Sequence, residues 1–352
     1  MSYTNGLDDP TLYFSSTIWT GNGVDDRDIV IDGTGMQPDF VWIKSRNDTD
    51  NHRLVDSVRG ATKHLESDGT GAEQTSSNVK AFTSTGVTLS TNGSVNANSE
   101  LYASWSWKAG TSFSNSSGSN GANLDSTGSV STTAGFSIVS FTGNRSTTRN
   151  IYHGLGAVPK MIIFKNRNTT NGWTIYNAVI GNANKLTLNS TNASGACTAC
   201  FASTNPTSTL FSVGDDSDTN GTSNNMIAYC FAEKKGYSKF GSYTGNGNAD
   251  GTFVYTGFKP AFVFVKRTNG TENWTIMDTT RDPFNVAVNK LHPNTSGGTD
   301  AGATIDILSN GFKNRTTNAG ANGSGDSYIY MAIAENPFVT STANGSIPAT
   351  AR

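Results

Sequence analysis

Short apolar runs separated by polar turn residues dominate the hydrophobic pattern of this chain. Three runs follow a proline: Phe40–Lys44 after Pro38, Met161–Lys165 after Pro159, and Phe262–Lys266 after Pro260. They are rich in β-branched and aromatic residues, and a nearly continuous apolar run of this length is typical of a central strand covered on both faces. The pattern therefore predicts three buried strands, each ending at a lysine where the strand leaves the core.

Three further runs alternate large and small residues with the period of a strand. They are Tyr102–Lys108, Met226–Glu233 and Tyr328–Glu335. A period of two places the larger side chains on one face of each strand: Trp105 with Trp107, Tyr229 with Phe231, and Met331 with Ile333. The residues between them are small (Ser106, Cys230 and Ala332), which predicts that a second layer backs each strand closely.

These runs belong to a repeat with a period of about a hundred residues. A Thr-Gly-Asn turn lies about 17 residues before each proline, and an aromatic residue or histidine lies about 14 residues after it. The turns are Thr20–Gly23, Thr142–Arg145 and Thr244–Gly247, and the later positions are His52, Trp173 and Trp274. The sequence therefore encodes three related domains.

The same pattern predicts an all-β fold of three tandem, related, antiparallel β-sandwich modules resembling jelly rolls. Helical periodicity is weak, and the best short-helix candidate is Asn285–Leu291. The expected organisation is an N-terminal arm (1–12), a first sandwich (13–110), a linker rich in Gly, Ser and Asn (111–135), a second sandwich (136–235), a third sandwich (236–338), and a C-terminal tail (339–352).

The composition and net charge argue against two classes of binding partner, nucleic acids and anionic membranes. Of the 352 residues, 35% are hydrophobic and 15% are charged, and the formal net charge is −2. A chain so close to neutral has no electrostatic footprint for nucleic acid or for an anionic membrane, and no apolar run approaches membrane-spanning length. We therefore expect neither partner. The near-neutral surface is compatible with a homo-oligomer, as a trimer or a symmetric array.

One turn has the spacing of half a calcium loop. Asp216, Asp218 and Asn220 offer oxygen atoms at alternate positions before Gly221, which predicts a calcium site, the only cofactor that the sequence suggests. The twelfth position is Ile227 rather than a bidentate glutamate, and an acidic turn between strands explains the same residues. Asn246–Gly251 fits the calcium pattern more weakly, with one carboxylate.

Other reactive residues favour structural interpretations. Cys197 and Cys200 have metal-ligand spacing, but a closed zinc site needs four ligands, so loop and core thiols are expected for these two and for Cys230. Asp56 with Arg59 and Asp278 with Arg281 recur at equivalent positions, while the second unit has Asn177 and Ile180 there. Repetition of this kind favours a structural ion pair or turn cap over a catalytic pair, so no enzyme activity is expected. The six tryptophans are candidates for sugar-stacking platforms, although strand packing explains most of them.

Several longer motifs resemble a family of repeat proteins encoded by marine tailed phages, including phages of cyanobacteria and of abundant marine bacteria. They are Ile18–Gly23, Pro38–Arg46, Trp105–Gly110, Gly236–Gly247, Ser309–Lys313 and Ala334–Phe338. The resemblance covers nearly the whole chain. It implies a virion structural protein with lectin-like β-sandwich modules, and it transfers no catalytic residue.

The sequence and this resemblance together lead to one functional expectation. The protein is expected to be a non-enzymatic virion protein, made in the host cytoplasm and exposed on the particle surface as capsid decoration or as a tail-fibre or adhesin component. Its expected partners are other virion proteins and further copies of itself. A carbohydrate-binding protein that recognises a host surface glycan is the alternative, and a glycan depolymerase is less favoured because no pair of acidic residues suggests a glycosidase site.

Overall fold

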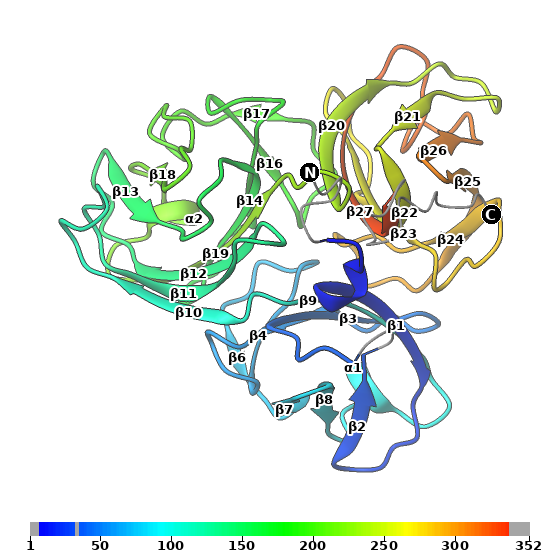
Figure 1. Ribbon diagram of the computed structural model, residues 1–352, viewed down its shortest axis with the longest axis horizontal. Coiled ribbons are helices and arrows are strands. Elements are labelled where there is room, and N and C mark those ends of the chain that lie inside the picture. The colour runs from blue at the N-terminus through cyan, green and yellow to red at the C-terminus, as the bar shows by residue number, and fades with distance from the viewer. Residues whose placement is uncertain (1–6, 32–34, 338–352) are drawn as a thin grey trace, which may run out of the picture.

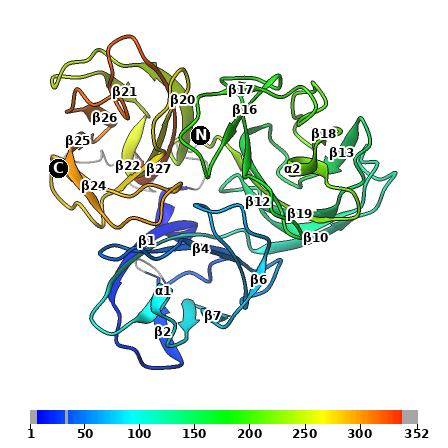
Figure 2. The same ribbon diagram turned by 180° about the vertical axis from the view of Figure 1, so that it is seen from behind.

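The computed structural model describes residues 7–31 and 35–337, and these form three sandwich-like units around a common centre (Figure 1). The fold is all-β and antiparallel, as the sequence predicts. Seen from behind, the three lobes again surround one junction (Figure 2). The predicted tail and residues 1–6 of the predicted arm lie outside the described residues. The rest of the arm is packed: Leu7 is buried in the central core, and a short 3-10 helix, η1 (Pro10–Leu12), adjoins the first strand.

Unit 1 (residues 13–110) pairs a six-stranded main sheet with a three-stranded second sheet. The main sheet, in spatial order, is β1 (Phe14–Thr20), β9 (Leu101–Trp107), β3 (Phe40–Ser45), β4 (Arg53–Asp56), β5 (Lys63–Leu65) and β6 (Gln74–Thr75). The second sheet is β2 (Arg27–Val30), β8 (Gly86–Leu89) and β7 (Val79–Thr83), and the helix α1 (Gly93–Asn96) precedes β9.

Unit 2 (residues 111–235) has an eight-stranded main sheet and a two-stranded second sheet. The main sheet is β10 (Thr111–Asn115), β11 (Ser126–Ser131), β12 (Phe136–Thr142), β19 (Asn225–Ala232), β14 (Pro159–Asn166), β15 (Thr174–Asn177), β16 (Asn184–Thr187) and β17 (Gly195–Ala196). The second sheet is β13 (Arg149–Tyr152) with β18 (Leu210–Val213), and the helix α2 (Ser217–Asn220) precedes β19.

Unit 3 (residues 236–337) has two four-stranded sheets. The main sheet is β20 (Ser238–Thr244), β27 (Ser327–Pro337), β22 (Phe258–Arg267) and β23 (Thr275–Asp278). The second sheet is β21 (Phe253–Tyr255), β26 (Gly311–Asn314), β25 (Asp300–Leu308) and β24 (Ala287–Lys290). The middle of every main sheet has the same order: β1-β9-β3-β4, β12-β19-β14-β15 and β20-β27-β22-β23.

Two local predictions are wrong. The segment 111–135 is not a linker, because β10 and β11 extend the main sheet of unit 2, with β11 paired to β12 along its whole length. β10 forms the edge of this sheet, where polar strand residues meet water. Residues 285–291 are not helical, because Ala287–Lys290 is strand β24. Apolar residues four apart, such as Ala287 and Leu291, fit a strand as well as a helix, and pairing with β25 decides between them.

The three main sheets share one central core. Phe40 and Trp42 of β3 face this core, while Val41 and Ile43 between them face the sandwich core of unit 1. The equivalent strands alternate in the same way: Met161 and Ile163 against Ile162 and Phe164, and Phe262 and Phe264 against Val263 and Val265. These strands are therefore covered on both faces, as their continuous apolar pattern predicts.

The closing strands β9, β19 and β27 lie beside β3, β14 and β22 in the same main sheets and face the same central core. Trp107, Phe231 and Ile333 are all buried in the central core. The small residues behind them face the separate sandwich cores, as with Cys230 in unit 2 and Ala332 in unit 3. Each main sheet therefore buries one face against its own second sheet and the other against the two neighbouring units.

A set of equivalent hydrogen bonds joins the units head to tail. In each unit the residue before β4, β15 or β23 donates from its ring to a backbone carbonyl of a neighbouring unit. The bonds are Trp173 Nε1 to Glu66 O (2.8 Å), Trp274 Nε1 to Thr187 O (3.0 Å) and His52 Nε2 to His292 O (3.1 Å). Trp42 Nε1 donates to His52 Nδ1 at 2.8 Å, so the proton of the neutral ring lies on Nε2, the atom that faces His292.

Backbone hydrogen bonds join the same pairs of units, with the donor and acceptor units exchanged. They run from Glu73 N to Arg167 O (2.8 Å), from Ser194 N to Thr268 O (2.8 Å) and from Thr299 N to Arg46 O (2.7 Å). Unit 1 thus bonds to unit 2, unit 2 to unit 3, and unit 3 back to unit 1. Head-to-tail contacts either close into a ring or continue into a filament, and here three units within one chain close the ring.

The lysines that end the three proline-led runs do not leave the core, contrary to the sequence expectation. Lys44, Lys165 and Lys266 are fully buried, and each ammonium donates to two backbone carbonyls. For Lys165 and Lys266, one of these carbonyls belongs to the neighbouring unit, at Thr70 and Thr191. Burial lowers the pKa of all three lysines to about 8. The charges of Lys165 and Lys266 are therefore part of the contacts between units, whereas Lys44 donates within its own unit.

The folded three-unit structure should lose stability in acid because of His52. Burial, followed by the nearby charge of Lys44, lowers the pKa of His52 from 6.5 to about 3. The folded protein therefore keeps the His52 imidazole neutral, while the same imidazole in the unfolded chain takes up a proton below pH 6.5. Acid therefore favours unfolding. Between pH 6.5 and 3 this one group should reduce the free energy of unfolding by up to about 5 kcal/mol.

Urea unfolding across this pH range tests the assignment. The variant His52→Gln has no titrating group at this position, so its stability should fall less steeply with acid, and its difference from the wild type should shrink toward pH 3. Equal pH slopes for the two proteins would show that His52 does not control this dependence.

Candidate functional site

The recurring acid–arginine pairs lie inside the protein, at the contacts between units. Asp56 Oδ2 accepts from Arg59 Nε at 2.5 Å, and both side chains are fully buried. Tyr229 of unit 2 donates its hydroxyl to the same carboxylate at 2.7 Å. Burial alone would lower the pKa of Arg59, but Asp56 raises it above its ordinary value. The pair is a buried structural contact, as the sequence suggests.

The second pair repeats this contact one unit further round the ring. Asp278 Oδ2 accepts from Arg281 Nε at 2.6 Å and from Trp105 Nε1 of unit 1 at 2.9 Å. The Arg281 guanidinium also lies over the Trp105 ring, 5.5 Å from its centroid. Trp105 and Tyr229 are equivalent closing-strand residues, so each carboxylate receives a donor from the neighbouring unit.

The third contact lacks the pair because it lacks the donor. The closing-strand residue of unit 3 that corresponds to Trp105 and Tyr229 is Met331, whose thioether cannot donate a hydrogen bond. At this contact unit 2 has Asn177 and Ile180 in place of the acid and the arginine, and Ile180 packs against the central core. A buried charge pair without further hydrogen bonds would cost desolvation energy, so the apolar version suits methionine.

The predicted calcium residues are held by three separate sets of partners. Asp216 is the N-cap of α2 and accepts from the backbone nitrogens of Asp218 and Thr219. The Asp218 carboxylate accepts from Asn171 Nδ2 at 2.7 Å and pairs with Lys185 Nζ at 3.1 Å. The calcium site stays a prediction from the sequence, and the structure gives these residues other roles.

Asn220 and the N-cap are also repeated in all three units. The buried amides of Asn96, Asn220 and Asn322 each accept from the backbone of the Thr-Gly-Asn turn, at Asn22 N, Asn144 N and Asn246 N. Asn92 and Asn318 cap their turns as Asp216 does. These positions therefore hold each turn against its closing strand.

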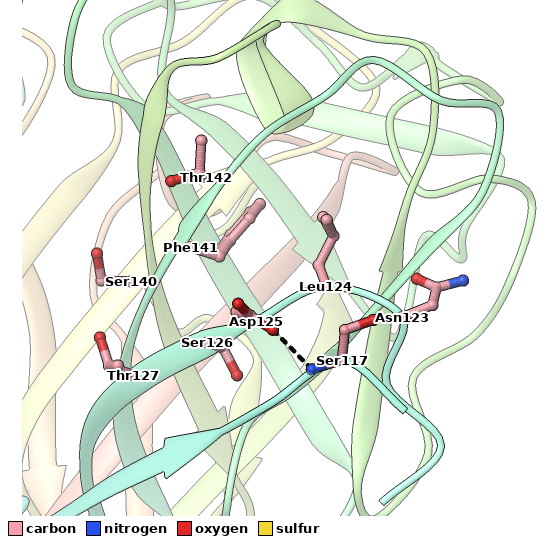
Figure 3. Close-up of a pocket in the computed structure, with 9 residues that line it drawn as sticks. All are labelled: Ser117, Asn123, Leu124, Asp125, Ser126, Thr127, Ser140, Phe141 and Thr142. Carbon is pink, nitrogen blue, oxygen red and sulfur yellow. Dashed lines mark hydrogen bonds between the residues drawn. The ribbon is translucent and has the colours of Figure 1, made fainter. Parts of the chain in front are cut away.

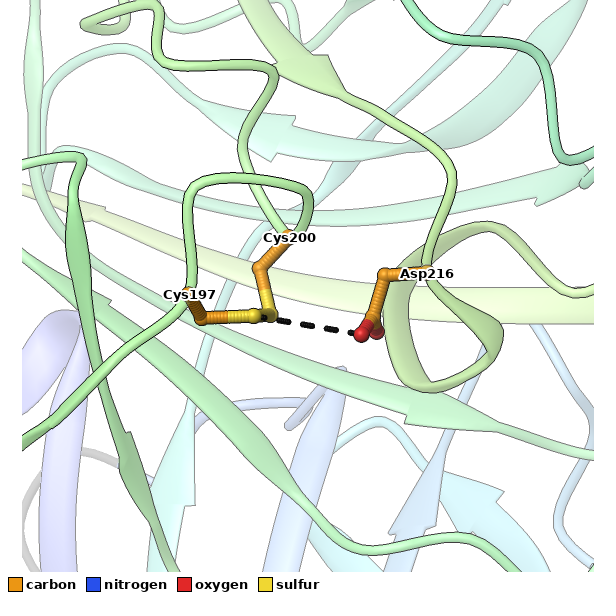
Figure 4. A group of neighbouring side chains, drawn as sticks. All are labelled: Cys197, Cys200 and Asp216. Atoms are coloured by element: carbon orange, nitrogen blue, oxygen red, sulfur yellow. Dashed lines mark hydrogen bonds between the residues drawn. A yellow bond between two sulfur atoms is a disulfide. The ribbon is translucent and has the colours of Figure 1, made fainter.

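Cys197 and Cys200 form a disulfide, so the expectation of two free thiols is wrong for this pair (Figure 4). Their Cα atoms lie 5.4 Å apart, within the range that a disulfide spans. Asp216 Oδ2 lies 3.8 Å from Cys197 Sγ. These three residues are the group of possible metal ligands found in the described part of the chain, but sulfurs joined in a disulfide are not thiolate ligands. Cys230 is a buried free cysteine, as expected.

A wide recess lies on unit 2, in the segment that the sequence assigned to a linker (Figure 3). It has a volume of about 400 Å³ and is lined mainly by hydroxyl and amide side chains between the start of β11 and the end of β12. Asp125 at its edge accepts from Ser117 N at 2.7 Å, which fixes the loop between β10 and β11. This recess offers polar contacts, but its one carboxylate already has a partner.

A smaller and more enclosed pocket of about 140 Å³ lies in unit 3, where β23 of the main sheet meets β24 and β25. Its charged lining residues are Glu272, Lys290, His292 and Asp300. His292 Nε2 lies 3.1 Å and Lys290 Nζ 3.4 Å from the Asp300 carboxylate. Burial would raise the pKa of Asp300, but the contacts with His292 and Lys290 lower it below its ordinary value. The pocket therefore brings cations and carboxylates together in one small space.

Residues 9–337 match the model of a family described as a domain of unknown function, DUF7483. The chain belongs to this family. A search of curated proteins found no match. The matched span runs through all three units, so the DUF7483 domain corresponds to the whole ring rather than to a single repeat.

Sequence reasoning found the architectural residues of this DUF7483 protein but missed its pockets. All six tryptophans, the candidate sugar platforms, are buried. The unit 3 pocket is lined by Thr275, Lys290 and Gly320 from three distant parts of unit 3, and no local motif marks them. An alignment of the three repeats carries the available signal, because at Gly320 unit 3 lacks the side chain that the other two units have. No helix in the described ranges is long and apolar enough to cross a membrane.

Removing the buried charge of Asp56 should be costly in this DUF7483 protein. The substitution Asp56→Asn keeps the shape but leaves the Arg59 guanidinium without its closest carboxylate, and breaking a buried pair costs about 3 to 5 kcal/mol. Asp215→Asn is the matched control, because Asp215 forms a 2.7 Å pair with Arg145 in which both side chains are exposed. The control should cost no more than about 1 kcal/mol in urea unfolding. Similar costs for the two variants would contradict the structural role of the buried pair.

Proposed function

We propose that this protein is a non-enzymatic structural protein exposed on the surface of a bacteriophage particle, as capsid decoration or as part of a tail fibre or adhesin. The observation that carries the proposal is the closed ring: three sandwiches share one core, and the recurring buried charges lie at the contacts between them. Together with the resemblance to virion proteins of marine phages, this architecture favours a scaffold role.

The geometry of the recurring carboxylates also favours a scaffold over a depolymerase. A glycosidase needs two carboxyl groups that flank a substrate groove at a fixed separation. Asp56 and Asp278 are instead buried in ion pairs beneath the central core, where no substrate reaches them. Their chemistry is that of a contact between units.

A particle surface provides a physical reason for such a module. Many identical copies on a symmetric particle need a rigid unit that presents the same outward surface every time. The ring buries its three main sheets at the centre and turns its second sheets and loops outward (Figure 1). The proposed partners are other virion proteins and further copies of the chain, and the proposed location is the assembled particle.

Recognition of a host surface glycan is the second candidate. The enclosed polar pocket of unit 3 favours it, because units 1 and 2 fill the equivalent space with the side chains of Arg53 and Asp218. This role is compatible with the first, since a surface protein of a phage particle is well placed to contact the host.

Mass spectrometry of purified particles tests the proposal. For a phage that encodes the chain, peptides from residues 9–337 should be found in particles purified by density gradient, at a copy number that matches a symmetric position, and antibody labelling should place them on the outer surface. Absence of the chain from infectious particles would overturn the proposal. Release of reducing ends from host polysaccharide by the purified protein would overturn its non-enzymatic part.

A further inference from the structure

The unit 3 pocket is open because Gly320 stands where units 1 and 2 have side chains, while Thr275 replaces the arginine of unit 1 and matches the threonine of unit 2. The equivalent positions are Arg53, Thr174 and Thr275 at the start of β4, β15 and β23, and Ser94, Asp218 and Gly320 in the turn before each closing strand. The turns align because Asn92, Asp216 and Asn318 cap them by the same hydrogen bond, two residues earlier. Only unit 3 has a short side chain at the first position and none at the second.

Units 1 and 2 fill this space with their own charges. In unit 1 the Arg53 guanidinium donates to Ser94 Oγ at 2.8 Å and pairs with Glu66. In unit 2 the Asp218 carboxylate accepts from Lys185 Nζ at 3.1 Å and from Thr174 Oγ1 at 3.4 Å. Both units therefore supply from within the chain the polar group that unit 3 leaves out.

Two polar groups of the unit 3 pocket are left without the partners that their equivalents have. Thr275 is 3% exposed and lines the pocket, yet its hydroxyl makes no hydrogen bond to the described residues. The Glu272 carboxylate, which also lines the pocket, forms no ion pair or hydrogen bond to them either. The Thr275 hydroxyl and the Glu272 carboxylate are therefore free to hydrogen-bond to a ligand in the pocket.

The unit 3 pocket is lined by groups of both charge signs, and this mixture favours a neutral ligand. The negative charge of a carboxylate or phosphate ligand would lie unfavourably close to Glu272 and Asp300. The positive charge of an amine would lie unfavourably close to Lys290 and His292. The hydroxyl groups of a sugar avoid both conflicts, because each can donate to a carboxylate and accept from an ammonium or a hydroxyl. The volume of about 140 Å³ is well below the roughly 300–1,000 Å³ of pockets for drug-sized ligands, so the site suits one sugar ring.

We propose that the pocket between β23, β24 and β25 binds one neutral saccharide ring, whose hydroxyls donate to Glu272 and accept from Thr275 and Lys290. This inference deepens the second candidate function, recognition of a host surface glycan. It rests on that proposal for the biological source of the sugar. The site is a terminal subsite, because the pocket holds a single ring. Its affinity for a free monosaccharide should be on the order of millimolar, since few contacts are available.

Ligand-observed saturation-transfer NMR on the full chain tests the site. The probes are neutral hexoses and deoxyhexoses, with a uronic acid, a hexosamine and inorganic phosphate as charged comparisons. Neutral sugars should bind the wild type, and the charged probes should bind less well. The absence of binding by any neutral sugar at millimolar concentration would overturn the inference, as would binding by the charged probes alone.

Two variants place the binding in this pocket. Gly320→Asp restores the carboxylate that fills unit 2, and Thr275→Arg restores the guanidinium that fills unit 1, so each should weaken binding by at least about 10-fold. If one variant fails to fold by circular dichroism, the other still tests the site. The matched control is Gly71→Asp, which adds the same side chain in unit 1 at a position with no atom within 4 Å of the new Cβ. Sugar binding that survives both pocket variants would overturn the inference.

This result is independent of the particle experiment. If the chain is found in virions but binds no sugar, the inference fails and the structural role stands. If the purified protein binds sugar through this pocket but the chain is absent from particles, the proposed virion role fails and the site stands.

Discussion

The structure depends on one constraint: each main sheet must bury both of its faces. The second sheet of a unit covers one face, and the other carries large apolar residues that no part of the same unit covers. Three units solve this together by turning those faces toward a shared centre. Because burial of apolar surface is the dominant favourable term in folding, the central core holds the ring together, and the hydrogen bonds set its register.

The polar contacts at the centre follow the local chemistry of each pair of units. The carboxylates of Asp56 and Asp278 are present where the neighbouring closing strand offers a donor, Tyr229 or Trp105. Where that strand offers Met331, the acid and the arginine are replaced by Asn177 and Ile180. At each contact between units, the residues on the two sides therefore differ together. The absence of the acid–arginine pair from unit 2 is explained by Met331, its partner in unit 3. The same reasoning explains the open pocket of unit 3, where divergence removed the side chain at Gly320.

Much of the fold could be predicted from periodicity alone. The continuous apolar runs around Val41, Ile162 and Val263 mark strands covered on both faces, and the alternation at Trp107, Phe231 and Ile333 identifies the core side of the closing strands. The sequence could not show that neighbouring units cover the second face of each main sheet. A lysine at the end of an apolar run is ordinarily taken to be exposed. Each of Lys44, Lys165 and Lys266 is buried with two backbone carbonyls accepting from its ammonium, and for Lys165 and Lys266 one of these carbonyls lies far along the chain, at Thr70 and Thr191. The edge strand β10 and its neighbour β11 were missed for the opposite reason, since their polar residues resemble a linker.

The candidate site was the least predictable part. Its groups come from β23, β24, β25 and a late turn, and their significance lies in what is missing at Thr275 and Gly320 rather than in a motif. The wide recess near Asp125 lies in a segment that the sequence marked as unstructured. The unit 3 pocket adjoins the contacts between units, because His292 and Glu272, which line it, also bond through their backbones to His52 and Thr191 of the neighbouring units.

The central claim is that the three units fold as one body, because none can cover its main sheet alone. Differential scanning calorimetry of the full chain tests this most directly, by comparing the van't Hoff enthalpy of unfolding with the calorimetric enthalpy. A shared core predicts one transition in which the two enthalpies are equal. Three separable transitions, or a van't Hoff enthalpy of about one third of the calorimetric value, would show that the units fold independently and would contradict the account.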